Sequence, residues 1–170
     1  MNQTQENRPE TVYEVVNPKG TSPIVLVCEH ASHVIPDQFA NLGLSGDALN
    51  SHAAWDPGAM AVARIMAQEL DAVLVASRVS RLVYDCNRPP EADGAMPAKS
   101  EIFDIPGNAN LTQAERATRT ATYYTPFKHA LASVIAAKAD PVLVTIHSFT
   151  PIYHGAQREV EVGILHDSDT

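Results

Sequence analysis

Several features that mark other classes of protein are scarce in this sequence. Its two cysteines, Cys28 and Cys86, are too few for a disulfide scaffold, which favours a reducing, cytoplasmic setting. No apolar run is long enough to cross a membrane, and the polar N-terminus lacks the apolar core of a signal peptide. Only 12 basic residues stand against 20 acidic ones, a net charge of −8, which argues against a nucleic-acid partner.

The 170 residues are enough for one domain with a buried core. We expect this domain at 23–170, after an extended leader at 1–22 that includes a short edge strand at 13–16. We therefore assign all the apolar segments of the sequence to one fold.

Continuous apolar runs rich in β-branched residues are typical of strands that are buried on both faces. Three such runs predict buried strands at 24–28, 73–76 and 142–146. Alternating apolar residues predict a fourth strand at 160–165, and residues 81–85 form a short strand or an extended piece.

Two helical segments separate the predicted strands. Asp56 and Pro57 are suited to the N-cap and first position of a helix that continues to about residue 70. Thr112 and Glu115 form a capping-box pattern before a helix that extends to about 139, in which Pro126 marks a kink or a break. A long loop at 89–110 is typical of a functional or mobile segment.

This order of strands and helices predicts an α/β fold with a mostly parallel sheet. Ligands of such sheets lie beyond the carboxyl ends of the strands. Three polar groups follow strand ends here, namely Glu29-His30, Asp85-Asn87-Arg88 and His147-Ser148. Histidines at the ends of two central strands, with a carboxylate from the Asp56 segment, match the two-histidine, one-carboxylate set of catalytic zinc sites.

Four segments carry a resemblance to a known family: 27–32, 52–59, 80–89 and 145–151. The most specific pieces are Asp-x-Asn-Arg at 85–88 and His-Ser-Phe-Thr-Pro at 147–151. From about residue 22 onward the chain resembles the N-formylglutamate amidohydrolase family. The resemblance implies a three-layer α/β/α sandwich with a mixed sheet, similar to zinc carboxypeptidases and zinc N-acetylmuramoyl-alanine amidases. It also implies a divalent metal, usually zinc, and hydrolysis of the N-acyl amide of an acidic amino acid.

The resemblance implies roles for individual residues. His30 and His147 match the metal histidines of the family. Asp56 is our choice as the carboxylate ligand over Glu29, because a residue next to His30 at a strand end usually points the other way.

The anion-binding residues are expected near the Asp-x-Asn-Arg piece. Arg88 would hold the substrate carboxylate with its fork of donors, and Asn87 would bind the same group or the scissile carbonyl. Asp85 would orient Arg88 or support a metal ligand. Arg81 and Ser148 are further candidates for contact with the substrate.

The resemblance further implies a general base, a glutamate on a strand beyond His147. The later acids are Glu159, Glu161, Asp167 and Asp169, and none lies in a segment like the family's Ile-Glu-x-Arg-Asn motif. Because family members continue past this point, we expect the C-terminal part of the family domain to be missing.

Three alternatives therefore stay open. In the first, the chain is a weak or inactive remnant that binds a metal or ligand, and its unpaired sheet edge favours a homo-oligomer. In the second, it is a zinc amidase that acts on a cell-wall peptide. In the third, it is an enzyme with a cysteine nucleophile, Cys28 beside His30 or Cys86 beside Arg88, although buried inert thiols are more common.

Overall fold

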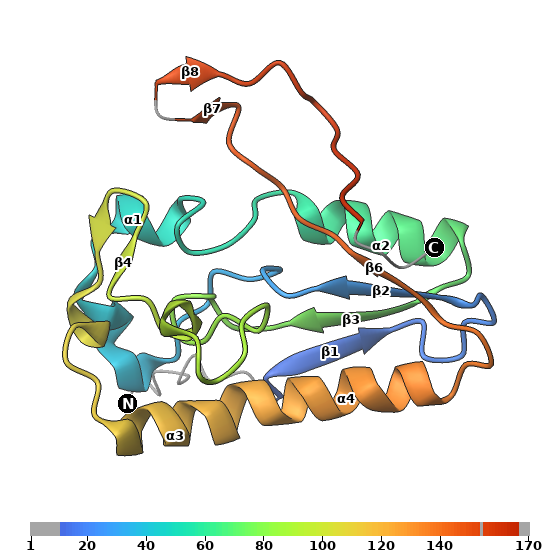
Figure 1. Ribbon diagram of the computed structural model, residues 1–170, viewed down its shortest axis with the longest axis horizontal. Helices are drawn as coiled ribbons and strands as arrows, with labels where there is room; N and C mark the ends of the chain where they lie inside the picture. The colour runs from blue at the N-terminus through green and yellow to red at the C-terminus, as the bar shows by residue number, and fades with distance from the viewer. Residues whose placement is uncertain (1–10, 154, 167–170) are drawn as a thin grey trace, which may run out of the picture.

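The computed structural model describes residues 11–153 and 155–166, so the predicted leader is described from residue 11 onward. The largest sheet has four strands in the order β1-β3-β2-β6 (Figure 1). β2 pairs in parallel with both β3 and β6, whereas β1 runs antiparallel to β3. The strand bounds are β1 (Tyr13–Val16), β2 (Ile24–Cys28), β3 (Val73–Ser77) and β6 (Val142–Thr145). The mixed, mostly parallel sheet confirms the predicted fold class.

Burial distinguishes the central strands from the edge strand β6. Every residue of β3 is buried, as are Val25, Leu26 and Val27 of β2. The prediction that 142–146 is buried on both faces is wrong, because Val142 and Leu143 are about half exposed. β6 is apolar like β2, but within the described residues it has a strand on one side only.

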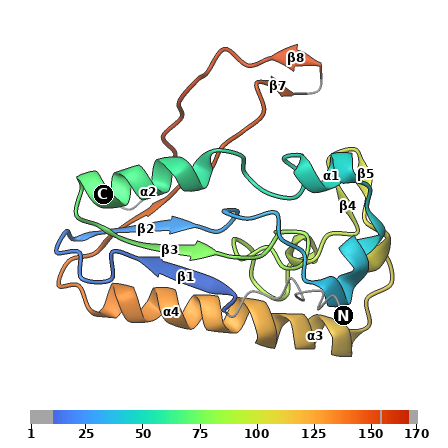
Figure 2. The same cartoon turned by 180° about the vertical axis from the view of Figure 1, so that it is seen from behind.

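Helices cover both faces of the sheet and produce three layers. α2 (Ala59–Glu69) lies on one face, and α3 (Gln113–Arg119) and α4 (Thr125–Ala136) lie on the other (Figures 1 and 2). The small side chains of Ala59, Ala63 and Ala67 let α2 pack directly against Leu26 and Leu74. On the opposite face, Val27 and Val75 share a core with the aromatic residues Tyr123 and Phe127. The α/β/α sandwich is thus built on alternating faces of β2 and β3.

The start of α2 differs from the prediction. Asp56 is not the N-cap, because the helix begins at Ala59 after Gly58, which has a left-handed backbone with φ of 85°. Glycine adopts this conformation without the steric cost of a side chain. The turn frees the buried carboxylate of Asp56 to point away from the helix.

The second helical segment is nearly continuous. The Thr112 hydroxyl accepts a hydrogen bond from the Glu115 amide at 3.2 Å, and the Glu115 carboxylate accepts one from the Thr112 amide at 2.8 Å. The predicted capping box is therefore confirmed. Pro126 lies in the first turn of α4, directly after a π-helical turn at Thr120–Tyr124 that separates the two α-helices. Proline has no backbone N–H to donate, but the N–H groups in the first turn of a helix have no partner within the helix. Pro126 therefore causes no further break.

Two segments for which a strand was predicted, one of them alternatively as an extended piece, are not strands in the described part of the chain. Residues 81–83 form a turn, and 84–85 have no regular structure; side chains rather than a neighbouring strand bind the Leu82 and Val83 carbonyls. Residues 160–165 are irregular, and Ile164 and Leu165 are almost fully exposed. Their alternating pattern suits a strand, but no described strand lies beside them to complete a hydrogen-bond ladder.

The remaining elements are short. α1 spans Gly46–Asn50, and 3-10 turns cover Asp37–Gly43, Asp93–Ala95 and Pro106–Asn108. Two small hairpins pair β4 (Lys99–Ser100) with β5 (Phe103–Asp104) and β7 (Ile152–Tyr153) with β8 (Ala156–Gln157). The loop predicted at 89–110 thus contains local structure. Within the described residues, no helix is both long and apolar enough to cross a membrane.

The central position of Leu26 can be tested by stability measurements. We expect Leu26→Ala to lower the free energy of unfolding by about 2–5 kcal/mol, because it leaves a cavity between β2 and α2. Urea denaturation measures this change. The control Val62→Ala removes a side chain that is 51% exposed on α2 and should change stability by less than about 0.5 kcal/mol. An equally small effect at Leu26 would contradict its place in the core.

Candidate metal centre

Two histidines come together because β2 and β6 are neighbouring parallel strands. His30 lies two residues beyond β2, and His147 lies two residues beyond β6. The strand register pairs Val27 with Thr145, and its continuation sets His147 opposite Glu29. The ring centroids of His30 and His147 are consequently 4.9 Å apart. His30 is buried, whereas the side chain of His147 is about one third exposed.

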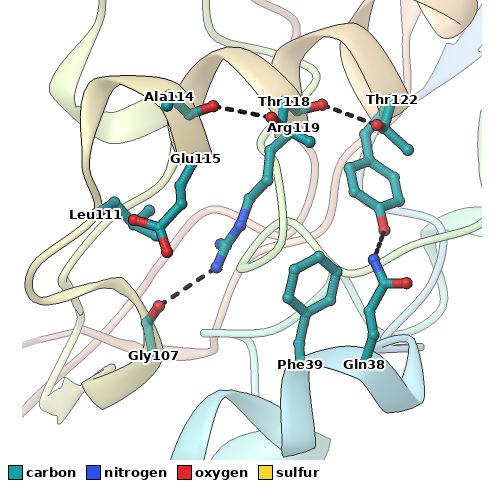
Figure 3. Close-up of a pocket in the computed structure, with 10 residues that line it drawn as sticks. Gln38, Phe39, Gly107, Leu111, Ala114, Glu115, Thr118, Arg119 and Thr122 are labelled. Atoms are coloured by element: carbon teal, nitrogen blue, oxygen red, sulfur yellow. Dashed lines mark hydrogen bonds between the residues drawn. The ribbon is translucent and has the colours of Figure 1, made fainter.

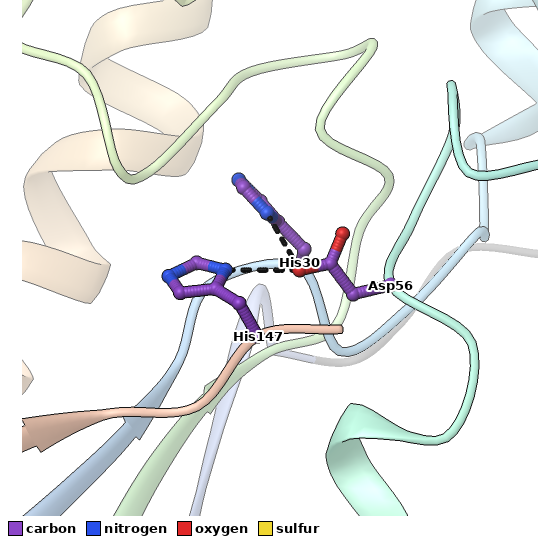
Figure 4. A group of neighbouring side chains, drawn as sticks. All are labelled: His30, Asp56 and His147. Atoms are coloured by element: carbon purple, nitrogen blue, oxygen red, sulfur yellow. Dashed lines mark hydrogen bonds and ion pairs between the residues drawn. The ribbon is translucent and has the colours of Figure 1, made fainter. Parts of the chain in front are cut away.

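Asp56 joins this pair from the segment before α2. Its backbone amide donates to the His30 carbonyl at 3.0 Å, which fixes the segment beside the end of β2. Asp56 Oδ2 then lies 3.2 Å from His30 Nδ1 and 2.9 Å from His147 Nδ1. Figure 4 shows both imidazole rings directed at this one oxygen. Ligand atoms of the three residues all lie within 4.8 Å of one another.

Each histidine has a second carboxylate at its other ring nitrogen. His30 Nε2 donates to Asp85 Oδ1 at 2.8 Å. His147 Nε2 lies 3.6 Å from Glu29 Oε2, which is an ion-pair distance rather than a hydrogen bond. Glu29 Oε2 is buried and accepts no hydrogen bond from the described residues. Both rings therefore direct Nδ1 at Asp56 and Nε2 at an outer carboxylate.

The pKa shifts follow from these contacts. Burial opposes ionisation of Asp56, but the hydrogen bonds from His147 and His30 prevail and hold its pKa well below the usual range. Burial likewise disfavours the charged form of His30, yet Asp56 and Asp85 raise its pKa. A His30 ring that donates from both nitrogens is an imidazolium, in agreement with that direction. Burial raises the pKa of Glu29.

Arg81 adds a positive charge to the same cluster. Its guanidinium lies 3.0 Å from Asp85 Oδ2 and 3.8 Å from Asp56 Oδ1. The pKa of Asp85 is lowered because His30 and Arg81 outweigh the effect of its burial. Arg81, a candidate for contact with the substrate, thus pairs with two buried carboxylates in this structure.

His52 is a neighbour of the cluster that the sequence analysis missed. His52 Nδ1 lies 3.7 Å from Asp56 Oδ1, and His52 Nε2 lies 3.4 Å from Ser148 Oγ. The spacing of four residues between His52 and Asp56 was a usable signal. Ser148 also donates its backbone amide to Asp56 Oδ2 at 3.4 Å and its hydroxyl to the Pro57 carbonyl at 2.9 Å.

Asn87 and Arg88 are exposed, in contrast to the buried residues His30, Asp56 and Asp85. The Asn87 backbone amide donates to Asp85 Oδ1 at 2.9 Å, and the Arg88 backbone amide donates to the Asp85 carbonyl at 2.9 Å. Asp85 therefore contacts Arg88 through the backbone, and its carboxylate binds His30 and Arg81. Among the described residues, no carboxylate lies within ion-pair distance of the Arg88 guanidinium.

Neither cysteine is suited to nucleophilic catalysis. Cys28 and Cys86 are both buried. Burial, together with the charges of Glu29 and Asp56, raises the pKa of Cys28 to about 12. The pKa of Cys86 is also raised, mainly by burial. A thiol must ionise to act as a nucleophile, so these shifts argue against that alternative.

Comparison with known proteins gives two findings. Residues 22–170 match the family model described as FGase, N-formylglutamate amidohydrolase. The chain is also similar to the solved structure of gene product Atu2144 from Agrobacterium tumefaciens, with 56% sequence identity and a TM-score of 0.90. This similarity covers 94% of the present chain and 65% of that chain, so the present chain spans less than two thirds of that relative. No curated protein matches the sequence.

The family match covers nearly the whole domain and includes every residue of the cluster. The fold found in the solved relative agrees with the three layers described above. The resemblance carried by residues 27–32, 52–59, 80–89 and 145–151 is thereby confirmed. The chain belongs to the N-formylglutamate amidohydrolase family.

Proposed function

We propose that the chain forms the metal-binding part of an amidohydrolase that cleaves the N-acyl amide of an acidic amino acid such as N-formylglutamate. The observation that carries this proposal is the convergence of two Nδ1 atoms on Asp56 Oδ2. Family membership supports the reaction class, and the donor atoms support a bound cation.

The residues of the cluster fit a zinc ion or another divalent metal. Nitrogen and carboxylate oxygen are usual zinc ligands, and ligand atoms of a tetrahedral site lie about 3.3–3.6 Å apart. The two contacts to Asp56 Oδ2, 3.2 and 2.9 Å, are close to that spacing. His30, Asp56 and His147 would hold the ion. Three protein ligands leave a position for water or substrate.

The outer carboxylates favour Asp56 over Glu29 as the ligand. Metal-bound histidines usually donate their second ring nitrogen to a carboxylate, which fixes the tautomer and the ring orientation. Asp85 suits this role for His30, and Glu29 suits it for His147. Arg81 balances the charge of Asp56 and Asp85 and keeps both carboxylates in place.

The exposed residues near the cluster suit substrate binding. A bound divalent metal would polarise the amide carbonyl and activate a water molecule. The Arg88 guanidinium has no carboxylate partner among the described residues and its fork matches a carboxylate, so it would hold the side-chain carboxylate of the substrate. Asn87 would donate to the same group or to the scissile carbonyl, and Ser148 lies between the cluster and His52. Together these residues orient the amide and lower the entropic part of the barrier.

Metal dependence is the first test of the proposal. We expect hydrolysis of N-formylglutamate to require zinc and to be abolished by a chelator. His147→Ala should lower kcat/KM by at least about 100-fold, because it removes one of three ligands. The control is His129→Ala, which removes an exposed histidine of α4 and should leave the rate unchanged.

Three other results would contradict the proposal. Hydrolysis that survives the chelator would exclude a metal mechanism. Tight zinc binding without hydrolysis would favour a binding remnant of the family. Preference for an amide of a cell-wall peptide over N-formylglutamate would favour a zinc amidase of that class.

The role of Arg88 can be tested by comparing two substrates that differ in one charge. We expect Arg88→Ala to reduce the preference for N-formylglutamate over the neutral N-formylglutamine by about 10- to 100-fold in kcat/KM, because a charged hydrogen-bonded pair is lost. Arg64→Ala is the matched control, since Arg64 lies on α2 and pairs with Glu14. An unchanged preference in Arg88→Ala would show that another group holds the side-chain carboxylate.

A further inference from the structure

Two residues of the candidate metal centre lie on a turn outside the sheet. Residues 80–85, called the 80–85 turn here, carry Arg81 and Asp85, and both side chains face the cluster. Strand pairing does not fix this segment, so its backbone groups need other partners. The positions of Arg81 and Asp85 depend on which groups supply them.

Several amides of the 80–85 turn donate within the turn or to other segments, among them the Ser80 amide, which donates to the Val34 carbonyl at 2.8 Å. The Leu82 amide donates to Ser80 Oγ at 3.1 Å, and the Val83 amide donates to the Ser80 carbonyl at 2.9 Å. The Asp85 amide donates to the Ala95 carbonyl at 2.8 Å. Ser80 Oγ also donates to the Ala54 carbonyl at 2.8 Å, which ties the turn to the segment that carries Asp56.

Two distant side chains supply donors for the carbonyls of the turn. Asn108 Nδ2 donates to the Leu82 carbonyl at 2.9 Å, and Arg119 Nη1 lies 3.4 Å from the Val83 carbonyl. Arg119 Nη1 also donates to Asn108 Oδ1 at 2.7 Å, so the two side chains act together. Asn108 comes from the end of the long loop, and Arg119 is the last residue of α3.

The surroundings of Arg119 hold its guanidinium in place. Arg119 lines a cavity of about 410 Å³. Figure 3 shows its side chain extending from α3 towards the Gly107 carbonyl. Arg119 Nη2 lies 3.3 Å from that carbonyl, and the guanidinium lies 4.6 Å from the centroid of the Phe39 ring. Arg119 is buried, and no described carboxylate lies within ion-pair distance of it.

A buried charge without a counter-ion is costly unless hydrogen bonds satisfy it. Here the acceptors are two backbone carbonyls and the Asn108 amide oxygen, and one of these carbonyls belongs to the 80–85 turn. Networks of this kind are rigid because the loss of one member leaves the others unsatisfied. The network therefore connects α3 to the segment on which Asp85 is held.

We propose that Asn108 and Arg119 are positioning residues that fix the 80–85 turn, so that Asp85 holds the His30 ring with Nδ1 directed at the metal. This inference rests on the proposed function for the role of the metal. Asn108 and Arg119 contact neither the cluster nor the exposed Arg88, so they act on His30 only through the 80–85 turn and Asp85. Neither residue is part of the resemblance carried by the four sequence segments.

A positioning role and a merely structural role give different results. A structural role alone lowers the melting temperature and leaves the His30 ring unchanged once the protein is folded. A positioning role changes the hydrogen bond between His30 Nε2 and Asp85, and this change is visible in the ring ¹⁵N resonances of His30 without any metal.

The experiment compares Arg119→Lys and Asn108→Ala with wild type, using long-range ¹H–¹⁵N spectra of the metal-free protein. We expect both variants to shift the His30 ring resonances in the direction that Asp85→Asn shifts them. We also expect the zinc Kd to rise by about tenfold, the lower end for loss of support around a metal ligand. The matched control is Arg116→Lys on the same helix, since Arg116 donates to Ala92 outside the 80–85 turn.

His30 resonances at wild-type positions in both folded variants would overturn the proposal, whatever their melting temperatures. Arg119→Lys keeps the buried charge, so it can test the proposal even where Asn108→Ala does not fold. Wild-type protein that binds no divalent metal would contradict the proposed function instead. The nitrogen spectra of the metal-free protein would still decide whether Asn108 and Arg119 control His30.

Discussion

The candidate site depends on one shared atom, Asp56 Oδ2, which two imidazole nitrogens approach at 3.2 and 2.9 Å. This contact exists because β2 and β6 are adjacent and parallel, so both histidines leave the sheet at the same edge. The left-handed turn at Gly58 then frees Asp56 from helix capping. Removal of either constraint would separate the three ligand atoms, and the outer carboxylates would lose the rings they orient.

Charge balance follows from the same arrangement. Asp56, Asp85 and Glu29 are buried carboxyl groups, and beside them lie the Arg81 guanidinium and the His30 ring, whose pKa Asp56 and Asp85 raise. Burial of several like charges is tolerated only where opposite charges and hydrogen bonds offset the loss of hydration. A divalent cation held by His30 and Asp56 would offset the same carboxylates.

The parts of the fold set by local pattern were predictable. The apolar runs of β2 and β3, the polar residues that follow β2 and β6, and the capping box at Thr112 are local signals that the structure confirms. Contacts between distant residues were not. The exposure of Leu143 depends on what lies beside the edge strand β6. The 80–85 turn depends on Asn108 and Arg119, which bind the Leu82 and Val83 carbonyls. The pairing of Asp85 with His30 spans 55 residues, so the Asp-x-Asn-Arg spacing could not distinguish it from an interaction with Arg88.

The most direct test is a calorimetric titration of the metal-free protein with zinc at several pH values. The account predicts one zinc ion per chain and, at a pH below the pKa of His30, release of a proton, because the metal displaces the proton from the ring. Asp56 and Asp85 raise this pKa, which extends the proton release to higher pH. The affinity should therefore fall by about tenfold per pH unit as the pH decreases below the pKa of His30. Absence of zinc binding at pH 8, or an affinity that does not change with pH, would contradict the account.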